Sequence, residues 1–134
     1  MNYYFRSINP LDREWSLFKQ KKGSVTIYYE HSQMLPDDIV LLYIGKQDEE
    51  LDSGVYAIGK VVSDVWRDED ERYCVKIKLL TRAVRNQPIV PESEAVLYKG
   101  NVKSVRNPFK VTEHVGKLSN RIDELLQEKE YNDQ

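Results

Sequence analysis

Apolar runs along the chain predict short strands. The continuous run from Ile39 to Ile44 has the length of a buried strand, and Val55 to Val62 is a second run rich in β-branched residues. A polar, acidic loop separates them, with Gly45 and Gly54 at its two ends. Glycine permits positive φ or a close backbone approach, as a barrel rim or a strand end that faces a ligand requires. We expect these two runs to be strands of one sheet, around which the rest of the chain is organised.

Other segments also have strand patterns. Tyr3 to Ser7 is a short aromatic run that ends at Asn9-Pro10, and Ser24 to Glu30 is strand-like. In Arg72 to Thr81 apolar residues alternate with Cys74 and two lysines, which predicts a strand with one apolar face. We therefore expect Cys74 to be a packed thiol and not a nucleophile.

Two segments have the periodicity of helices. Leu11 to Gln20 follows a proline and has apolar residues at spacings of four and three, so we expect a helix that covers the sheet. Near the C-terminus an apolar stripe runs from Val115 to Leu126, and Thr112 is its expected N-cap. Between them, Pro88 to Gly100 predicts a short strand and a turn of helix.

Five or six short strands with these helices predict an α+β fold, in which a curled sheet or small barrel is covered by helices. The length fits one domain over residues 1–130, followed by a short acidic tail at 131–134. No apolar run approaches the roughly 18 residues that span a membrane, so we expect no membrane partner. The N-terminus lacks the pattern of a signal peptide and there is a single cysteine, so we expect a cytoplasmic protein.

Charge is distributed unevenly. The net charge is −2, yet the segment from Lys76 to Lys117 holds nine basic and three acidic residues, a local balance of +6. Acidic residues concentrate in 48–52, 64–71 and the C-terminal tail. Two interpretations stay open: a basic face that attracts phosphate, or solvated faces that segregate by chance.

Sequence motifs for catalysis or cofactors are absent. The chain contains neither GxxxxGK nor GxGxxG, and His31, His114 and Cys74 do not form a zinc motif. We therefore expect no metal, no cofactor and no catalytic residue. Aromatic rings are abundant before residue 60, where they either pack in the core or stack on a nucleobase. Binding is favoured over catalysis.

Five segments, in their order and spacing, carry a family resemblance: YYFRSINP, LPDDIVLLYIG, SGVYAIGKVVSD, YCVKIKLL and VRNPFKVT. Together they resemble the EVE domain of the PUA-like superfamily, from about Tyr3 to about Leu126. The resemblance implies a PUA-like pseudo-barrel, shared with YTH and ASCH domains, and a pocket for a modified base of DNA or RNA.

The resemblance also implies a set of site residues. At the pocket we expect Ser7, Asn9, Tyr43, Ile44 and Gly45, with Tyr43 stacking on the base at the pocket mouth. Members often have a tryptophan where this chain has Val25, and here Trp15, Tyr28 and Tyr29 are the candidate rings. Residues expected to hold phosphate are Lys46, Lys103, Arg106 and Asn107.

Two alternatives to a non-catalytic base reader stay open. One is a hydrolase of modified nucleosides like the ASCH group, using Lys46 and an acidic residue of the following loop, although Gly45-Lys46 matches the GxKxxExR-like motif poorly. The other is an interaction module whose pocket has decayed. The sequence does not name the modification, choose between DNA and RNA, or fix the oligomeric state.

The Asn107-Pro108 context of Arg106 predicts a phosphate contact. Arg106→Ala should weaken nucleic-acid binding and lower the magnitude of the salt slope by about one unit, with little loss of thermal stability. Binding titrations at several salt concentrations measure this. An unchanged affinity and slope would reject the role, and an equal loss of stability would indicate a structural residue.

Overall fold

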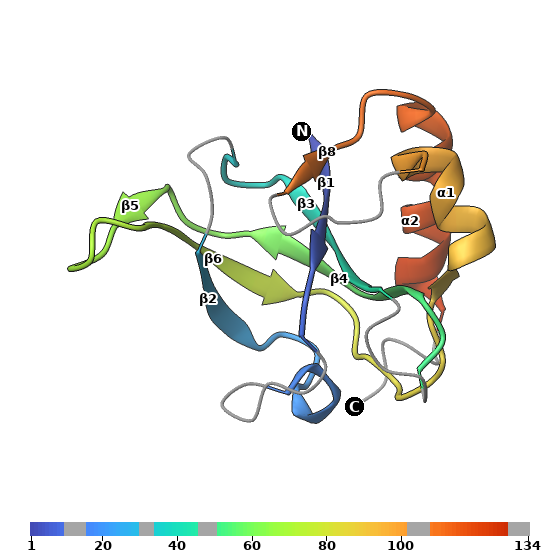
Figure 1. The fold of residues 1–134 in the computed structure, drawn as a ribbon, viewed down its shortest axis with the longest axis horizontal. Helices are drawn as coiled ribbons and strands as arrows, with labels where there is room; N and C mark the ends of the chain where they lie inside the picture. The colour runs from blue at the N-terminus through green and yellow to red at the C-terminus, as the bar shows by residue number, and fades with distance from the viewer. Residues whose placement is uncertain (10–15, 30–33, 46–50, 102–107, 129–134) are drawn as a thin grey trace.

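The computed structural model of the protein describes residues 1–9, 16–29, 34–45, 51–101 and 108–128 (Figure 1). Eight strands, one 3-10 helix and two α-helices make up this part of the chain. In chain order they are β1 (Tyr3–Ser7), η1 (Leu17–Lys19), β2 (Val25–Tyr29), β3 (Ile39–Ile44), β4 (Gly54–Val61), β5 (Trp66–Arg67), β6 (Tyr73–Leu79), β7 (Val90–Pro91), α1 (Glu92–Lys99), β8 (Phe109–Lys110) and α2 (Val115–Gln127).

All eight strands belong to one mixed sheet. Its main path runs β2-β6-β4-β3-β1-β8, while β5 pairs with β6 and β7 pairs with β4. The pairing of β1 with β3 is parallel and the others are antiparallel. The expectation that β1, β3, β4 and β6 share one sheet is thus confirmed, as is the α+β class. The sheet, however, is open and has eight strands where five or six were expected, because β5, β7 and β8 are pairings of only two residues.

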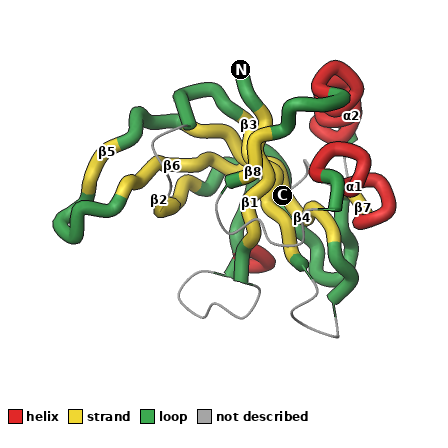
Figure 2. The backbone as a smooth tube through the Cα atoms, turned by 45° about the horizontal axis from the view of Figure 1, so that its top comes forward, coloured by secondary structure: helices red, strands yellow, loops and turns green. Residues whose placement is uncertain are grey.

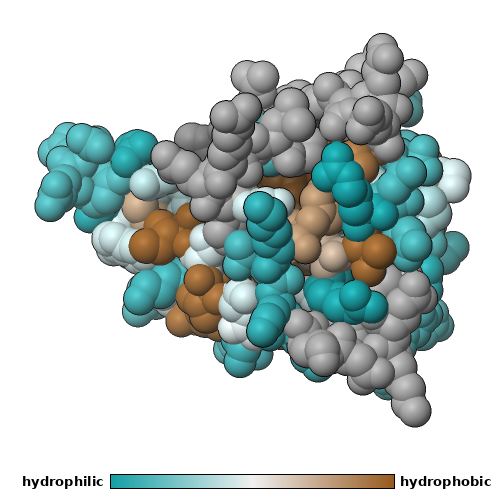
Figure 3. Space-filling view, turned by 90° about the horizontal axis from the view of Figure 1, so that it is seen from below, coloured by the Kyte–Doolittle hydropathy of each residue, from teal (hydrophilic) through white to brown (hydrophobic). Residues whose placement is uncertain are grey.

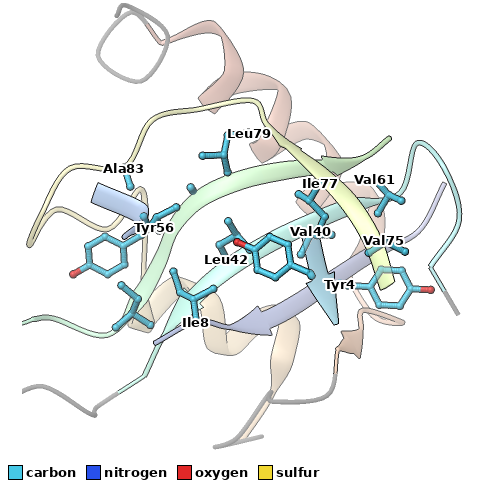
Figure 4. Packing of buried hydrophobic residues seen from close by; sticks show 14 of the residues in the cluster. Tyr4, Ile8, Val40, Leu42, Tyr56, Val61, Val75, Ile77, Leu79 and Ala83 are labelled. Atoms are coloured by element: carbon cyan, nitrogen blue, oxygen red, sulfur yellow. The ribbon is translucent and has the colours of Figure 1, made fainter. Parts of the chain in front are cut away.

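The central strand β3 is buried on both faces, which explains its continuous apolar sequence. Ile39, Leu41 and Tyr43 face a core that also contains residues of α1 and α2. Both helices lie together on this side of the sheet (Figures 1 and 2). The alternate residues of β3 face a second core on the other side, to which most other strands contribute (Figure 4).

β4 contains a β-bulge that shifts its register against β3 next to the end of β3. Leu42 pairs with Ala57 but Tyr43 pairs with Val55, so Tyr56 is the extra residue. Tyr56 and Ala57 consequently point into the same core although they are consecutive. The Tyr56 hydroxyl donates to the carbonyl oxygen of Asp52 at 2.7 Å, which fastens the chain just before β4.

The helix expected over Leu11 to Gln20 is not found in the half that the structure describes. Only Leu17–Lys19 is helical, as one 3-10 turn, because Ser16 and Gln20 are extended with ψ of 123° and 143°. The buried residue there is Leu17, whereas the expected apolar stripe was Leu11, Trp15 and Phe18. Residues 10–15 lie outside the described part.

The other two helices differ from expectation in the length of α1 and in the N-cap of α2. The expected turn of helix before Gly100 is an eight-residue helix, α1. The stripe of α2 is confirmed by its buried residues Leu118, Ile122 and Leu125. Its N-cap, however, is His114, in the left-handed conformation with φ of 58°, so the Thr112 cap is wrong. Among the described residues, no helix is long and apolar enough to cross a membrane.

Two glycine substitutions should have opposite effects on stability. A Cβ at Gly59 would lie 2.5 Å from the Cγ2 of the buried Ile77, so Gly59→Ala should lower the free energy of unfolding by about 1–3 kcal/mol. A Cβ at Gly116 in α2 meets nothing within 4 Å, so Gly116→Ala should raise it by about 0.4–1 kcal/mol. Urea unfolding measures both; a neutral Gly59→Ala would contradict this packing.

Candidate functional site

The parallel strands β1 and β3 end side by side. Ser7 pairs with Tyr43, and beyond β1 the N–H of Ile8 donates to the carbonyl oxygen of Tyr43 at 2.9 Å. Paired residues point their side chains to the same face of a sheet, so the Ser7 side chain shares a face with Tyr43. The carboxyl ends of parallel strands are a common place for ligands in α/β folds, which makes this end of the sheet a candidate site.

The start of α1 is brought to this place through β4 and β7. Tyr43 pairs with Val55 of β4, which pairs with Val90 of β7, and α1 begins two residues later at Glu92. Gly54 permits this approach: it has φ of 154°, and a Cβ there would lie 2.5 Å from the carbonyl oxygen of Val90. Any larger residue at position 54 would push β7 away from β4.

Glu92 is the centre of a small polar network. Its Oε2 accepts a hydrogen bond from the Tyr43 hydroxyl, and its Oε1 lies 2.7 Å from the Nζ of Lys99 at the other end of α1. The Lys99 ammonium also lies 5.0 Å from the centroid of the Tyr43 ring. The Lys99 side chain is only 4% exposed, whereas that of Glu92 is 36% exposed. The carboxylate is therefore held from inside the protein, while the Glu92 side chain as a whole is partly open to solvent.

Burial and the carboxylate act on the Tyr43 hydroxyl in the same direction. Loss of hydration is the larger cause, and the hydrogen bond to Glu92 adds to it, so the pKa of Tyr43 is raised well above its usual value. The hydroxyl thus stays protonated and donates to Glu92 at neutral pH. With a hydroxyl and an ammonium beneath it, the Glu92 carboxylate is a fixed hydrogen-bond acceptor for a ligand.

The network also has a structural effect. A buried ammonium is costly unless it is paired, and Glu92 is the ion-pair partner that the described residues supply to Lys99. Because Tyr43 belongs to β3 and the charged pair to α1, these contacts fasten the helix to the sheet. Removal of one partner would therefore affect stability as well as any binding.

Five predicted pocket residues come from the two strand ends. Ser7 is half-buried and shares a register row with Tyr43, while Asn9 lies two residues past Ser7 and is exposed. Ile44 is fully buried in the second core, and Gly45 is half-buried. The expectation that the Tyr43 ring stands at an open mouth is wrong. It is 5% exposed and packs edge-on against Phe5, with 6.3 Å between ring centroids.

Tyr28 and Tyr29 are not brought together with Tyr43. They lie on β2, which β6 and β4 separate from β3, and Tyr28 packs in the core on the other face of the sheet. Their link to the candidate site is Arg6. Its guanidinium lies 4.9 Å from the Tyr28 ring centroid and donates to the carbonyl oxygens of Ser7 at 2.8 Å and Tyr29 at 3.2 Å.

The remaining predicted residues lie outside the described part of the chain: Trp15, Lys46, Lys103, Arg106 and Asn107. Lys99, one of the nine basic residues of the segment from Lys76 to Lys117, is buried and paired with Glu92, so it does not contribute to a basic surface. Cys74 is a buried thiol, as expected, and burial raises its pKa. In the described ranges, no cluster of three or more His, Cys, Asp or Glu side chains could hold a metal.

Sequence reasoning missed Glu92 and Lys99 as a pair. Both were counted only as charges of the basic segment. Their spacing of seven residues in the segment PESEAVLYK could have indicated the pair, because residues at this spacing lie on the same face of a helix. Nothing in the sequence, however, links that face to Tyr43.

Comparison with known proteins addresses the fold alone. No protein-family model matches the chain, and no curated protein matches it. A hypothetical protein from Leishmania major is similar in structure, with a TM-score of 0.58 and 15% identity over 96% of this chain and 98% of that one. The X-ray structure of a protein from Agrobacterium tumefaciens has a TM-score of 0.56 and 22% identity, over 96% and 97% of the two chains.

The Tyr43–Glu92 contact predicts a pH-dependent stability. Tyr43→Phe should lower the free energy of unfolding by about 1–2 kcal/mol at neutral pH, because Glu92 loses a donor. The raised pKa of Tyr43 also means that, above about pH 10, the unfolded chain releases this proton before the folded protein does. Wild-type stability should thus fall as pH rises beyond 10, and this part of the decline should be missing in Tyr43→Phe.

Urea unfolding at neutral pH and above pH 10 measures both effects. Tyr29→Phe, at an exposed ring, is the matched control and should stay within about 0.5 kcal/mol of wild type at neutral pH. Equal alkaline decline in wild type and Tyr43→Phe would contradict the described environment of Tyr43.

Proposed function

We propose that the protein is a non-catalytic module that binds DNA or RNA and reads a modified base at the ends of β1 and β3. The observation that carries the proposal is Glu92, whose carboxylate is held by Tyr43 and Lys99 and whose side chain is 36% exposed. A carboxylate fixed in this way is suited to accept a hydrogen bond from an exocyclic amino group of a base. An orientation fixed before binding lowers the entropic cost of recognition.

The roles of the individual residues follow from their positions. Glu92 accepts from the base edge, and the Ser7 hydroxyl, on the same face as Tyr43, supplies a second polar contact. Tyr43 orients Glu92 and does not stack on the base, since its ring is buried. Asn9, exposed just past β1, is available to the same ligand.

Cations near these strand ends would hold the nucleic-acid backbone. Phosphate contacts supply much of the affinity of nucleic-acid complexes but little of their specificity. We assign the same role to Lys46, Lys103, Arg106 and Asn107 on the strength of the family resemblance.

The family assignment is part of the proposal. We infer an EVE-like domain with a PUA-like pseudo-barrel from the resemblance of the five sequence segments. The contact from Arg6 of β1 to the carbonyl oxygen of Tyr29 supports it, because it links strands at opposite ends of the path from β2 to β1. A curled sheet brings such strands together, as in a partly closed barrel.

A hydrolase of modified nucleosides is the second candidate. The observation in its favour is a buried lysine paired with a carboxylate, here Lys99 and Glu92 in place of the pair expected around Lys46. In such an enzyme Glu92 would accept a proton from the attacking water as general base. Release of product from a modified nucleoside would distinguish this function from binding.

The proposed reader is tested by neutralising Glu92. Glu92→Gln should weaken binding of the preferred modified oligonucleotide by at least tenfold. It should also reduce the difference in binding free energy between the modified and the unmodified oligonucleotide by about 1–3 kcal/mol, because one base contact is lost. Probes are methylated, hydroxymethylated and unmodified oligonucleotides at one salt concentration. Glu94→Gln is the matched control on the same helix, since Glu94 pairs with Arg121 and not with the site.

Folding must be measured alongside, because Glu92→Gln leaves Lys99 buried without its anionic partner. The double variant Glu92→Gln with Lys99→Met removes both charges and provides a folded alternative. Equal discrimination by wild type and both variants would reject the reader. Turnover of a modified nucleoside that Glu92→Gln abolishes would favour the hydrolase, and no binding of any oligonucleotide would favour an interaction module.

A further inference from the structure

One half of the sheet has an uncovered face. The helices α1 and α2 cover the end of the sheet near β1 and β3, whereas β2, β5 and β6 extend beyond them (Figures 1 and 2). On β2 three large hydrophobic side chains that share one face are about half exposed: Val25 at 54%, Ile27 at 51% and Tyr29 at 49%. Figure 3 shows exposed hydrophobic surface beside the hydrophilic projection of the β5–β6 turn.

The same strand has a backbone edge with which no described strand pairs. β2 is the last strand on its side of the sheet path. Its pairing partner Lys76 uses its N–H and carbonyl oxygen toward β4, with Ser63 Oγ at 2.8 Å and the Val62 N–H at 2.9 Å. In an antiparallel pair the two opposite residues point their peptide groups the same way, both inward or both outward. The N–H and carbonyl oxygen of Ile27 therefore point out of the sheet, as do those of Val25 and Tyr29.

Charge differs between the two ends of β2. At the Val25 end the exposed lysines are Lys19, Lys21, Lys22 and Lys78, whereas the exposed Lys76 lies opposite Ile27 in the middle of β2. At the Tyr29 end the turn between β5 and β6 projects, and residues 64–72 hold five acidic and two basic residues. Arg72 there is committed to Asp68 and Asp70, and its guanidinium lies 3.9 Å from the Tyr29 ring centroid. The acidic turn would repel a nucleic-acid backbone that followed this edge.

We infer that β2 pairs with β2 of a second copy of this chain, antiparallel about a two-fold axis at Ile27. In that register Ile27 lies opposite Ile27 of the partner, and each Val25 lies opposite a Tyr29, so the outward peptide groups pair. The lysine end of each copy comes beside the acidic turn of the other. A parallel arrangement would instead place lysines beside lysines.

In this dimer the outer edges of the two β2 strands pair with each other, so the edge that is exposed in the monomer becomes buried. A two-fold interface uses the same surface in both copies, which requires this kind of self-complementarity. The other end of the sheet path is β8, which has two residues in the described part of the chain, so the described sheet offers no second long edge for further growth. The Tyr29 carbonyl oxygen, which Arg6 already contacts, keeps a second lone pair for the partner's N–H.

Sedimentation equilibrium on the full chain tests this pairing. The weight-average mass should rise from 15.8 kDa toward that of two chains between about 1 µM and about 1 mM. Ile27→Lys should weaken the dimer at least tenfold, whereas the matched control Val96→Lys, at a 39% exposed apolar residue of α1, should not. A monomer across the whole range, or equal effects of both variants, would overturn the proposal.

Charge exchange tests the orientation of the two copies. Lys21→Glu and Glu69→Lys should each weaken the dimer about threefold to tenfold at low salt, since each variant alters two symmetric contacts. The double variant should restore it. Circular dichroism on each variant checks that it is folded. If the folded double variant does not regain the dimer affinity of the wild type, the antiparallel register is excluded.

Discussion

Burial of β3 on both faces is the constraint on which the rest of the structure depends. A strand with apolar side chains on both sides must have a core above and below it. Here the two helices contribute to one core, and residues from several other strands form the other. Parallel pairing with β1 and antiparallel pairing with β4 satisfy its backbone. The end of β3 is thereby fixed, and with it the position of Tyr43.

The polar network is built on that fixed end. The Tyr43 ring is anchored in the core, so its hydroxyl has little freedom, and Glu92 receives a donor whose position the sheet determines. Lys99 contributes the compensating charge from two turns along the same helix. A rigid acceptor that is open to solvent needs such support, because an unsupported surface carboxylate would be mobile and well hydrated. The proposed reading of a base edge rests on this rigidity.

Strands were predictable because their signals are local. The bounds of β1 and β3 match the predicted ranges, and β4 begins one residue earlier than the Val55 expected from its apolar run. Prediction was weaker where tertiary contacts decide the conformation. Ser16 and Gln20 are extended although the sequence around them has helical spacing, and a left-handed His114 starts α2 in place of a side-chain cap.

The site was predictable only in part, for a similar reason. Register places Ser7 beside Tyr43, as the strand pattern and the resemblance led us to expect. The burial of the Tyr43 ring could not be foreseen, since it depends on Phe5 from another strand and on α1. Glu92 and Tyr43 are 49 residues apart, and they meet through two intervening strand pairings that no local pattern encodes.

Nuclear magnetic resonance can show directly whether a modified base binds at Glu92 and the ends of β1 and β3. Isotope-labelled protein would be titrated with the modified oligonucleotide that binds most tightly, at fixed salt. We expect the largest amide shifts on Ser7 to Asn9, on Tyr43 to Gly45 and at Glu92 at the start of α1, with the β5–β6 turn unaffected. Shifts confined to β2 and β6, or no shift near Glu92, would contradict it.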